Sequence, residues 1–440
     1  MPFDTISCIN NGNFLHLINL DSLGVKTIPR SEIENIYKNL RDGLDNELRD
    51  FIDAESFLSA MHPSSSSFCI NPLLALSFDC NYSCDYCYQK ERKKDNGQLS
   101  TDDLLRVDEF YNHYCDHYAL PFRYGTFTII GGEPLLPKNR LVIESIFRKW
   151  KNQEFAITTN GTNIEDFFDL LIKYQVRIKV SLDGTRAMHY EKRHTKDSSA
   201  YEKTIMGIKR LVNAEIPVTI LSVYNPLNYQ KYPEFFDEME SCGWLSTPYL
   251  NLAFIPEMGR GCDDINMEYL HSANLTFLKL KEFDYRTAYV NARKLVPGAF
   301  ALEKALYEAK SYNTFYPYRC SLLELPDYSF LPNGDVMLCL QIENQEGRVG
   351  RFKPHVEIDF EKIDRLKLRR IDKLEKCLTC KVKILCKGGC AATSVENSGN
   401  PYDPYCGIWQ HPDFLDYIEN VMDYSQVKME QKHEKNSIDW

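Results

Sequence analysis

The stretch that decides the fold is SFDCNYSCDYCYQK, from Ser77 to Lys90, which places Cys80, Cys84 and Cys87 within eight residues. Three thiols suit neither a set of disulfides, which needs an even number, nor a structural zinc site, which takes four ligands in a closed tetrahedron. An iron–sulfur cube has four irons, so three thiolates hold it and leave one iron open. The spacing therefore predicts a cluster with one iron free to bind another molecule.

The composition of the whole chain excludes several classes of partner. Its 440 residues suffice for two or three domains, and 52 basic against 62 acidic residues give a net charge of −10, without a basic block to follow nucleic acid. The first residues lack the features of a signal peptide, and no apolar run reaches the roughly 20 residues that span a bilayer. We therefore expect a cytoplasmic protein with no nucleic-acid or membrane partner. In that compartment its 15 cysteines indicate metal binding or catalysis rather than disulfides.

Six short apolar segments alternate with amphipathic helices after residue 72. The expected strands are 73–79, 126–132, 154–160, 176–184, 216–224 and 249–256, and the clearest expected helices are 102–118, 141–151 and 201–213. Ser100 and Thr101 are suitable caps for the first of these helices. Such a βα series predicts an α/β fold with a parallel sheet, curled into a partial (β/α)6 TIM-like barrel. Chemistry in such barrels lies at the C-terminal ends of the strands, where Cys80 follows the first one.

The rest of the chain divides into smaller regions. Residues 1–70 are expected to form an α+β domain, with a hairpin in 13–29 and helical periodicity from 30 to 61. The barrel covers 71–260, and a bridging region covers 261–312. A cysteine-rich domain covers 313–412, and a charged helix or tail covers 413–440.

The cysteine motif and the loops after it resemble the radical SAM superfamily. The motif is Cys80-x3-Cys84-x2-Cys87 with the aromatic Tyr86 before its last thiol. GGEP ends the second strand, TTNGT the third and SLDG the fourth, which is the order found in that superfamily. Each loop alone could be a tight turn, and the motif alone could be a zinc knuckle.

The resemblance implies S-adenosylmethionine (SAM) as a cofactor that supplies a 5′-deoxyadenosyl radical, with the protein positioning it. Cys80, Cys84 and Cys87 would hold the catalytic cluster. Gly131 and Gly132 would leave room beside the methionine part of SAM, Glu133 would accept from its ammonium group and Arg193 would pair with its carboxylate. The other implied SAM contacts are Tyr86, on the adenine, and Asn160, Ser181 and Asp183. Arg193 could instead be a surface charge.

A second cysteine pattern resembles the SPASM extension of radical SAM enzymes, which binds two auxiliary [4Fe–4S] clusters. Its members here are Cys320, Cys339, Cys377, Cys380, Cys386, Cys390 and Cys406. By the family's pattern Cys377, Cys380, Cys386 and Cys406 would hold the outer cluster. Cys320, Cys339 and Cys390 would hold the inner one, whose fourth ligand could be Cys262, Cys69, another side chain, water or a substrate thiolate. A zinc knuckle over 377–390 is the alternative. Cys8, Cys69, Cys115, Cys242 and Cys262 are expected to be packed as small apolar residues.

The resemblance implies a maturase that installs a cross-link, of C–C, C–O or thioether type, or a related modification on a ribosomal precursor peptide. A flavodoxin or ferredoxin would supply its electrons. Sulfatase maturases carry Asp where this chain has Leu340 and usually begin close to their first motif, which favours the peptide branch over them. The N-terminal region resembles either a shortened winged-helix-type leader-binding domain or a structural cap. A non-catalytic iron–sulfur carrier and a zinc-bound module are the other classes.

Overall fold

The computed structural model describes residues 6–10, 14–19, 25–29, 68–94, 97–225, 227–244, 247–257, 325–342, 344–370, 373–378, 380 and 388–406. The helices expected in 30–61, the bridging region 261–312 and the tail 413–440 lie outside these residues, as do Cys262, Cys320 and Cys386.

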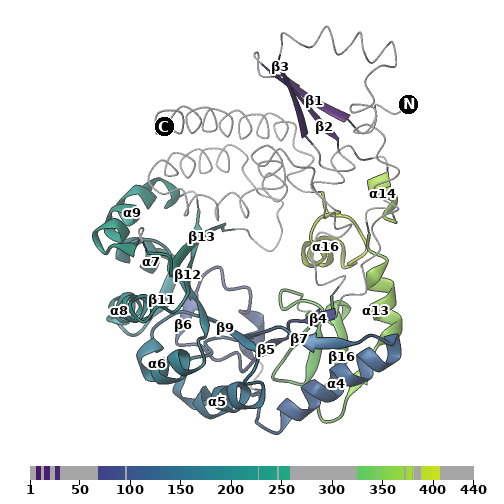
Figure 1. Cartoon of the computed structure of the whole chain (residues 1–440), viewed down its shortest axis with the longest axis horizontal. Coiled ribbons are helices and arrows are strands. Elements are labelled where there is room, and N and C mark those ends of the chain that lie inside the picture. The colour runs from purple at the N-terminus through teal and green to yellow at the C-terminus, as the bar shows by residue number, and fades with distance from the viewer. Residues whose placement is uncertain are drawn as a thin grey trace, which may run out of the picture.

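All six predicted strands are present and pair in parallel in chain order. They are β5 (Leu73–Ala75), β8 (Thr126–Ile130), β9 (Glu154–Thr159), β10 (Arg177–Ser181), β12 (Val218–Tyr224) and β13 (Leu250–Pro256). Figure 1 shows them along an arc that does not close, with the helices on its outer side. The fold is therefore the predicted partial barrel of α/β type.

The outer helices are α4 (Asp103–Tyr118), α5 (Arg140–Lys149), α6 (Ile164–Lys173), α7 (Arg186–Lys192), α8 (Ala200–Asn213) and α9 (Tyr232–Ser241). Short 3₁₀ turns at 91–94, 137–139, 229–231 and 345–347 complete the connections. In α6 the apolar side chains of Ile164, Phe167, Leu170 and Leu171 are buried, at the spacing that places them on one helix face. That face packs on the sheet and leaves the acidic first turn and Lys173 toward water.

The N-cap of α4 is Asp102 rather than the predicted Ser100 or Thr101, but Ser100 still holds the turn before the helix through a reciprocal pair of hydrogen bonds with Asp103. The Ser100 hydroxyl accepts from the backbone N–H of Asp103 (3.3 Å), and the Asp103 carboxylate accepts from the backbone N–H of Ser100 (2.9 Å). This pairing satisfies donors that the first turn of a helix leaves open. The helix ends at Ala119, whose φ of 51° lies in the left-handed region.

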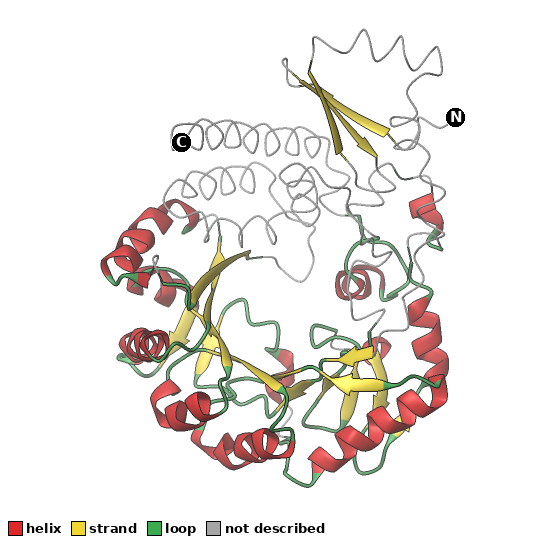
Figure 2. Cartoon of the chain, in the orientation of Figure 1, coloured by secondary structure: helices red, strands yellow, loops and turns green. Residues whose placement is uncertain are grey.

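The sheet continues beyond the barrel into the region predicted as a separate domain. β14 (Ser329–Phe330) pairs in parallel with β5, and β15 (Asp335–Met337), β16 (Arg348–Arg351) and β17 (Glu357–Ile358) follow in antiparallel order. The helices α13 (Phe360–Lys367), α14 (Glu375–Leu378) and α16 (Ala391–Ser398) lie on this side of the arc (Figure 2). The predicted boundary at 260 thus divides one continuous sheet of ten strands in the described residues.

Three smaller sheets complete the described fold. β1 (Ile6–Asn10), β2 (Phe14–Asn19) and β3 (Val25–Pro29) form an antiparallel sheet that includes the predicted hairpin. β4 (Phe68–Ile70) pairs with β7 (Phe122–Tyr124), and β6 (Tyr82–Cys84) pairs with β11 (Arg193–Thr195). None of the described helices combines the length and apolar character needed to cross a membrane.

Candidate functional site

The loop that carries the first three cysteines leaves the C-terminal end of β5 and packs tightly against the loop after β8. A Cβ atom added to Gly131 would lie 2.3 Å from the carbonyl oxygen of Ser77, and one added to Gly132 would lie 2.2 Å from that of Asp79. The backbone N–H of Gly132 donates to Ser77 (2.9 Å) and that of Glu133 to Asp79 (2.8 Å). The glycines of GGEP therefore allow two loops of the chain to approach each other, and their role beside SAM stays a prediction.

The three thiols of this loop are half-buried. The backbone N–H of Tyr82 donates to Cys80 Sγ (3.4 Å), and Arg193 Nη1 donates to Cys84 Sγ (3.7 Å). Burial, and then the charge of Glu133, raises the pKa of Cys80 to about 12, and burial also raises the pKa of Cys84. Thiols in this environment ionise when a metal centre coordinates them, because the metal supplies the missing positive charge.

Arg193 lies beside the cysteine loop because β11 pairs with β6 and places Arg193 opposite Cys84. The side chain is buried, its Nε donates to Asp183 Oδ2 (2.8 Å), and its guanidinium lies 5.3 Å from the ring centroid of Tyr86. The Tyr86 hydroxyl donates to the same carboxylate oxygen, and the backbone N–H of Val223 donates to Asp183 Oδ1 (2.9 Å). Arg193 is thus not a surface charge, and Asp183 is the acceptor that holds Arg193 and Tyr86 in place.

Glu133 joins the loops after β8 and β9. Its carboxylate is 1% exposed and accepts hydrogen bonds from the Leu135 N–H (2.8 Å), the Thr159 hydroxyl (2.6 Å) and the Asn160 N–H (2.7 Å). Burial raises its pKa to about 7 against these donors. Asn160 Nδ2 in turn donates to Asn81 Oδ1 in the cysteine loop (2.7 Å). Glu133 and Asn160 therefore tie three strand ends together.

The predicted SAM-binding residues thus gather at the C-terminal ends of β5, β8, β9 and β10, where Ser181 is half-buried as the last residue of β10. Whether each of them also contacts SAM stays a prediction.

The sequence reasoning missed His189, whose Nδ1 accepts from the Asp183 N–H (3.3 Å). Burial, and then the charge of Arg193, lowers the pKa of His189 to about 3, so this imidazole is neutral. Its one sequence signal is its position between SLDG and Arg193.

Five cysteines of the second pattern lie within the described residues. Cys377 is buried in α14, Cys390 precedes α16, and Cys339, Cys380, Cys390 and Cys406 are half-buried. Burial, and then the charge of Cys380, raises the pKa of Cys406, which indicates that these two thiols are close. A Cβ atom added to Gly389 would lie 2.0 Å from the carbonyl oxygen of Tyr405, so the backbones beside Cys390 and Cys406 are also in contact.

Tyr88 connects the two cysteine patterns. Burial raises its pKa, and the charges of Cys339 and then Cys87 raise it further, so its phenol lies within the electrostatic reach of both thiols. Nearby, Arg92 Nη2 donates to the Ile342 carbonyl (2.6 Å), which joins the first cysteine loop to the segment after Cys339.

The cysteines outside the two patterns have different environments. Cys115 is buried in α4, as predicted, whereas Cys242 is exposed, so the prediction that it packs as an apolar residue is wrong. It directly follows α9, whose buried face consists of Tyr232, Phe235, Phe236 and Met239. Cys69 would contact a Cβ atom at Gly125 at 2.6 Å, next to the N-terminal end of β5 and thus opposite the end that carries the cysteine loop. That position argues against Cys69 as a ligand of the inner cluster.

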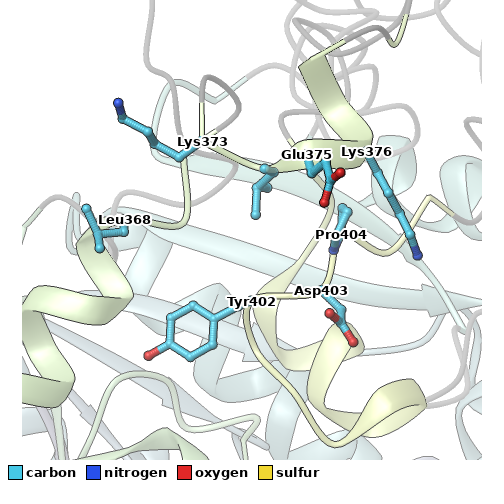
Figure 3. A pocket seen from close by; sticks show the side chains of 8 residues that line it. Leu368, Lys373, Glu375, Lys376, Tyr402, Asp403 and Pro404 are labelled. Carbon is cyan, nitrogen blue, oxygen red and sulfur yellow. The ribbon is translucent and has the colours of Figure 1, made fainter.

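A pocket of about 430 Å³ lies beside the segment that carries Cys377 of the second cysteine pattern (Figure 3). Leu368, Leu374, Tyr402 and Pro404 give it apolar walls, and Lys373, Lys376, Glu375 and Asp403 add charges of both signs. The balanced charges favour neither an anionic nor a cationic ligand. Lys376, which lines the pocket, directly precedes Cys377, so the pocket borders the segment that carries this cysteine.

The donors at the first loop fit an iron–sulfur cluster: three thiols in one loop, with a backbone N–H directed at one sulfur and a guanidinium at another. Among the described residues, no three His, Cys, Asp or Glu side chains are gathered as for a single metal ion.

Residues 75–239 match the family model of the radical SAM superfamily. The chain therefore contains a radical SAM domain, whose family implies a [4Fe–4S] cluster and SAM.

Particular relatives agree with this assignment. The chain is 25% identical over 213 residues to a probable GTP 3′,8-cyclase of Saccharolobus islandicus, covering 48% of this chain and 60% of that protein. It is 24% identical over 331 residues to a serine-type anaerobic sulfatase-maturating enzyme of Klebsiella aerogenes, covering 71% and 77%. The solved structure of native anSMEcpe with bound AdoMet and Cp18Cys peptide superposes with a TM-score of 0.57 at 17% identity, covering 81% and 99%. The chain thus spans 60% of the length of the cyclase, and the structural likeness establishes the shared fold.

Proposed function

We propose that this protein is a radical SAM maturase that modifies a ribosomally made precursor peptide by forming a cross-link or a related bond. When bound, the cluster and SAM supply a 5′-deoxyadenosyl radical. Cys80, Cys84 and Cys87 hold the cluster through the thiols that one strand end presents together. Arg193, fixed by Asp183, presents the rest of its guanidinium to the SAM carboxylate.

The observation that carries this proposal is the pairing of β6 with β11. It aligns Arg193 with Cys84 and keeps a buried cation beside a cysteine loop whose thiols bind metal as anions. An iron–sulfur electron carrier has no need of a buried arginine held at this distance by a carboxylate. The conjunction therefore supports a site that binds an anionic cofactor next to the cluster, which is an enzyme's site rather than a carrier's.

Two auxiliary clusters are part of the proposal. Cys377, Cys380, Cys386 and Cys406 hold the outer one, and Cys320, Cys339 and Cys390 hold the inner one. Closing a bond from a substrate radical to a closed-shell product releases one electron and one proton, and these clusters would supply an acceptor for the electron. A flavodoxin or ferredoxin supplies the electron that starts each turnover. The closeness of Cys380 to Cys406 supports the outer set.

Sulfatase maturation is the second candidate, since a sulfatase-maturating enzyme is among the relatives. Leu340 argues against it. At the position where sulfatase maturases carry a proposed aspartate base, this chain has a side chain that is 4% exposed and packed with Ala75, Phe78 and Met337. An apolar side chain in that environment can neither take nor hold a proton, which supports the peptide-maturase branch.

The test is anaerobic incubation of the reconstituted protein with SAM, a reductant and the peptide encoded beside its gene, followed by mass spectrometry. Ring closure removes two hydrogens from the peptide, and a thioether would point to a substrate thiolate on the inner cluster. Deleting residues 1–66 is expected to spare SAM cleavage and abolish modification of the full precursor. Turnover of the Cp18Cys peptide with no change in the neighbouring peptide would favour the sulfatase branch. Turnover of a small molecule alone would refute both.

A further inference from the structure

Arg369 is a buried arginine that no part of the proposed chemistry uses. It follows α13, is 1% exposed, and is among the largest fully buried side chains of the described residues. Its guanidinium donates along all three of its nitrogens: Nε to the Pro401 carbonyl (2.5 Å), Nη1 to Gly389 (3.0 Å), and Nη2 to Gly388 (2.8 Å) and to the Ser394 hydroxyl (3.1 Å). One side chain therefore connects the residues after α13 with residues 388–394 and with Pro401.

The segments that Arg369 connects lie next to cysteines of the second cysteine pattern. Gly388 and Gly389 directly precede Cys390 and have left-handed φ values of 76° and 73°. The hydroxyl of Ser394 donates to the carbonyl of Cys390 (3.1 Å), which fixes the start of α16. Pro401 begins the short segment that ends at Cys406. Both sides of this contact thus lead within five residues to a predicted cluster ligand.

Cys377 joins the same arrangement through Leu374. A Cβ atom at Gly388 would lie 2.6 Å from Leu374 Cδ1 and 3.8 Å from Cys377 Sγ, and the backbone N–H of Cys377 donates to the Leu374 carbonyl (2.8 Å). Leu374 and Tyr402 also line the pocket that borders the Cys377 segment. The guanidinium therefore lies at the point where the segments around Cys377, Cys390 and Cys406 meet.

Arginine suits this position for a geometric reason. Its planar guanidinium has five N–H donors in a fixed fork, whereas the lysine ammonium is a single point with three donors at the end of a flexible chain. Four acceptors, three of them within residues 388–394 and the fourth at Pro401, occupy all three nitrogens of Arg369. A lysine could reach one or two of them and would leave the remaining buried carbonyls without a donor.

We propose that Arg369 is a positioning residue for the auxiliary clusters: it holds the backbone beside Cys390, a ligand of the proposed inner cluster, and beside Cys406, a ligand of the outer one, so that these thiols are correctly spaced before iron enters. The inference rests on the proposed function, since it requires that auxiliary clusters exist. It goes further by naming a residue outside both cysteine patterns on which the auxiliary clusters depend.

The test compares Arg369→Lys with Arg365→Lys in the full chain. Arg365 lies four residues earlier, on the exposed side of α13 against the Tyr402 ring, and controls for an Arg-to-Lys exchange in this helix. Cys377→Ser and Cys390→Ser variants provide the references for loss of the outer and of the inner cluster. Each protein is reconstituted anaerobically. Its iron content, its electron paramagnetic resonance (EPR) spectrum after reduction and its formation of 5′-deoxyadenosine are then measured.

Wild type and Arg365→Lys are expected to hold about 12 irons, from three cubes of four. Arg369→Lys is expected to hold about four to eight, to lose EPR signals that Cys377→Ser or Cys390→Ser also loses, and to keep forming 5′-deoxyadenosine. A full iron content with the wild-type spectrum would overturn the inference. Loss of iron at every site, together with loss of SAM cleavage, would also overturn it, because Arg369 would then stabilise the whole fold. A wild type with only about four irons would show that the auxiliary clusters are absent. That result would refute this part of the proposed function, and it is distinguished from a failure of the inference because it needs no comparison with Arg369→Lys.

Discussion

Asp183→Asn removes the acceptor on which the Arg193 arrangement depends. Both carboxylate oxygens of Asp183 face donors: Oδ1 the N–H of Val223, and Oδ2 both Arg193 Nε and the Tyr86 hydroxyl. An asparagine amide must direct its NH2 group at one of these sets of donors, and it also leaves the guanidinium without its carboxylate. The side chains of Arg193 and Asp183 are only 9% and 2% exposed, so water cannot replace the lost partner.

Removing one member of a buried ion pair costs about 3–5 kcal/mol, because the other charge stays buried without compensation. We therefore expect Asp183→Asn to lower the free energy of unfolding of the iron-free protein by about this amount. The matched control is Asp169→Asn. Asp169 also pairs with an arginine, Arg140 (2.5 Å), but the two side chains are 65% and 37% exposed, and such a surface pair contributes less than about 1 kcal/mol.

Urea denaturation followed by circular dichroism under anaerobic conditions would measure both variants, with the radical SAM domain as the cooperative unit. Asp183→Asn should move the midpoint strongly and Asp169→Asn hardly at all. Adding Arg193→Gln to Asp183→Asn should cost less than the sum of the two single changes, because each removes the same interaction. Equal midpoints for Asp183→Asn and Asp169→Asn would refute the claim that this buried pair organises the site.

Three further outcomes follow from the geometry. The pKa of Glu133 is about 7 in the folded protein, against 4.5 in the unfolded chain. The folded state therefore binds more protons between these pH values, so the free energy of unfolding falls as pH rises from about 4.5 to 7. Glu133→Gln should flatten this pH dependence of the denaturation midpoints, and an unchanged slope would contradict the expectation. Gly132→Ala should reduce iron at the first loop because its Cβ would lie 2.2 Å from the Asp79 carbonyl. Gly243→Ala strains only a left-handed turn after α9 (φ 71°) and its Cβ meets no atom within 4 Å, so it should keep full iron; equal iron in both would refute the packing argument. Arg193→Lys should weaken SAM binding at least tenfold in anaerobic calorimetry while iron is retained, and unaltered binding would separate Arg193 from the cofactor.

The barrel could be predicted because its strands are marked by local sequence. Each of the six strands is a short apolar run followed by a polar loop, and amphipathic helices separate them, so order and direction follow from the rule for parallel crossovers. The position of Cys80 at a strand end follows from the same rule. The resemblance supplied the remaining site residues, and the structure brings those within the described residues to the same end of the sheet.

What could not be predicted depends on contacts between residues distant in sequence. Nothing local indicates that Arg193 pairs with Cys84, 109 residues away, or that the Asp183 carboxylate is shared by Arg193 and Tyr86. The addition of β14 to β5 was missed for the same reason, because two-residue strands have no periodicity to read. Nothing in the charged stretch around Arg369 indicates that its guanidinium donates to four acceptors in residues 388–401.

The central claim is that Cys80, Cys84 and Cys87 together hold the cluster that cleaves SAM. The most direct measurement compares the variant in which all three are alanine with a control in which Cys69, Cys115 and Cys242 are alanine. The first should lose about four irons and all formation of 5′-deoxyadenosine while the auxiliary irons remain, and the control should keep both. Formation of 5′-deoxyadenosine by the first variant would contradict the account.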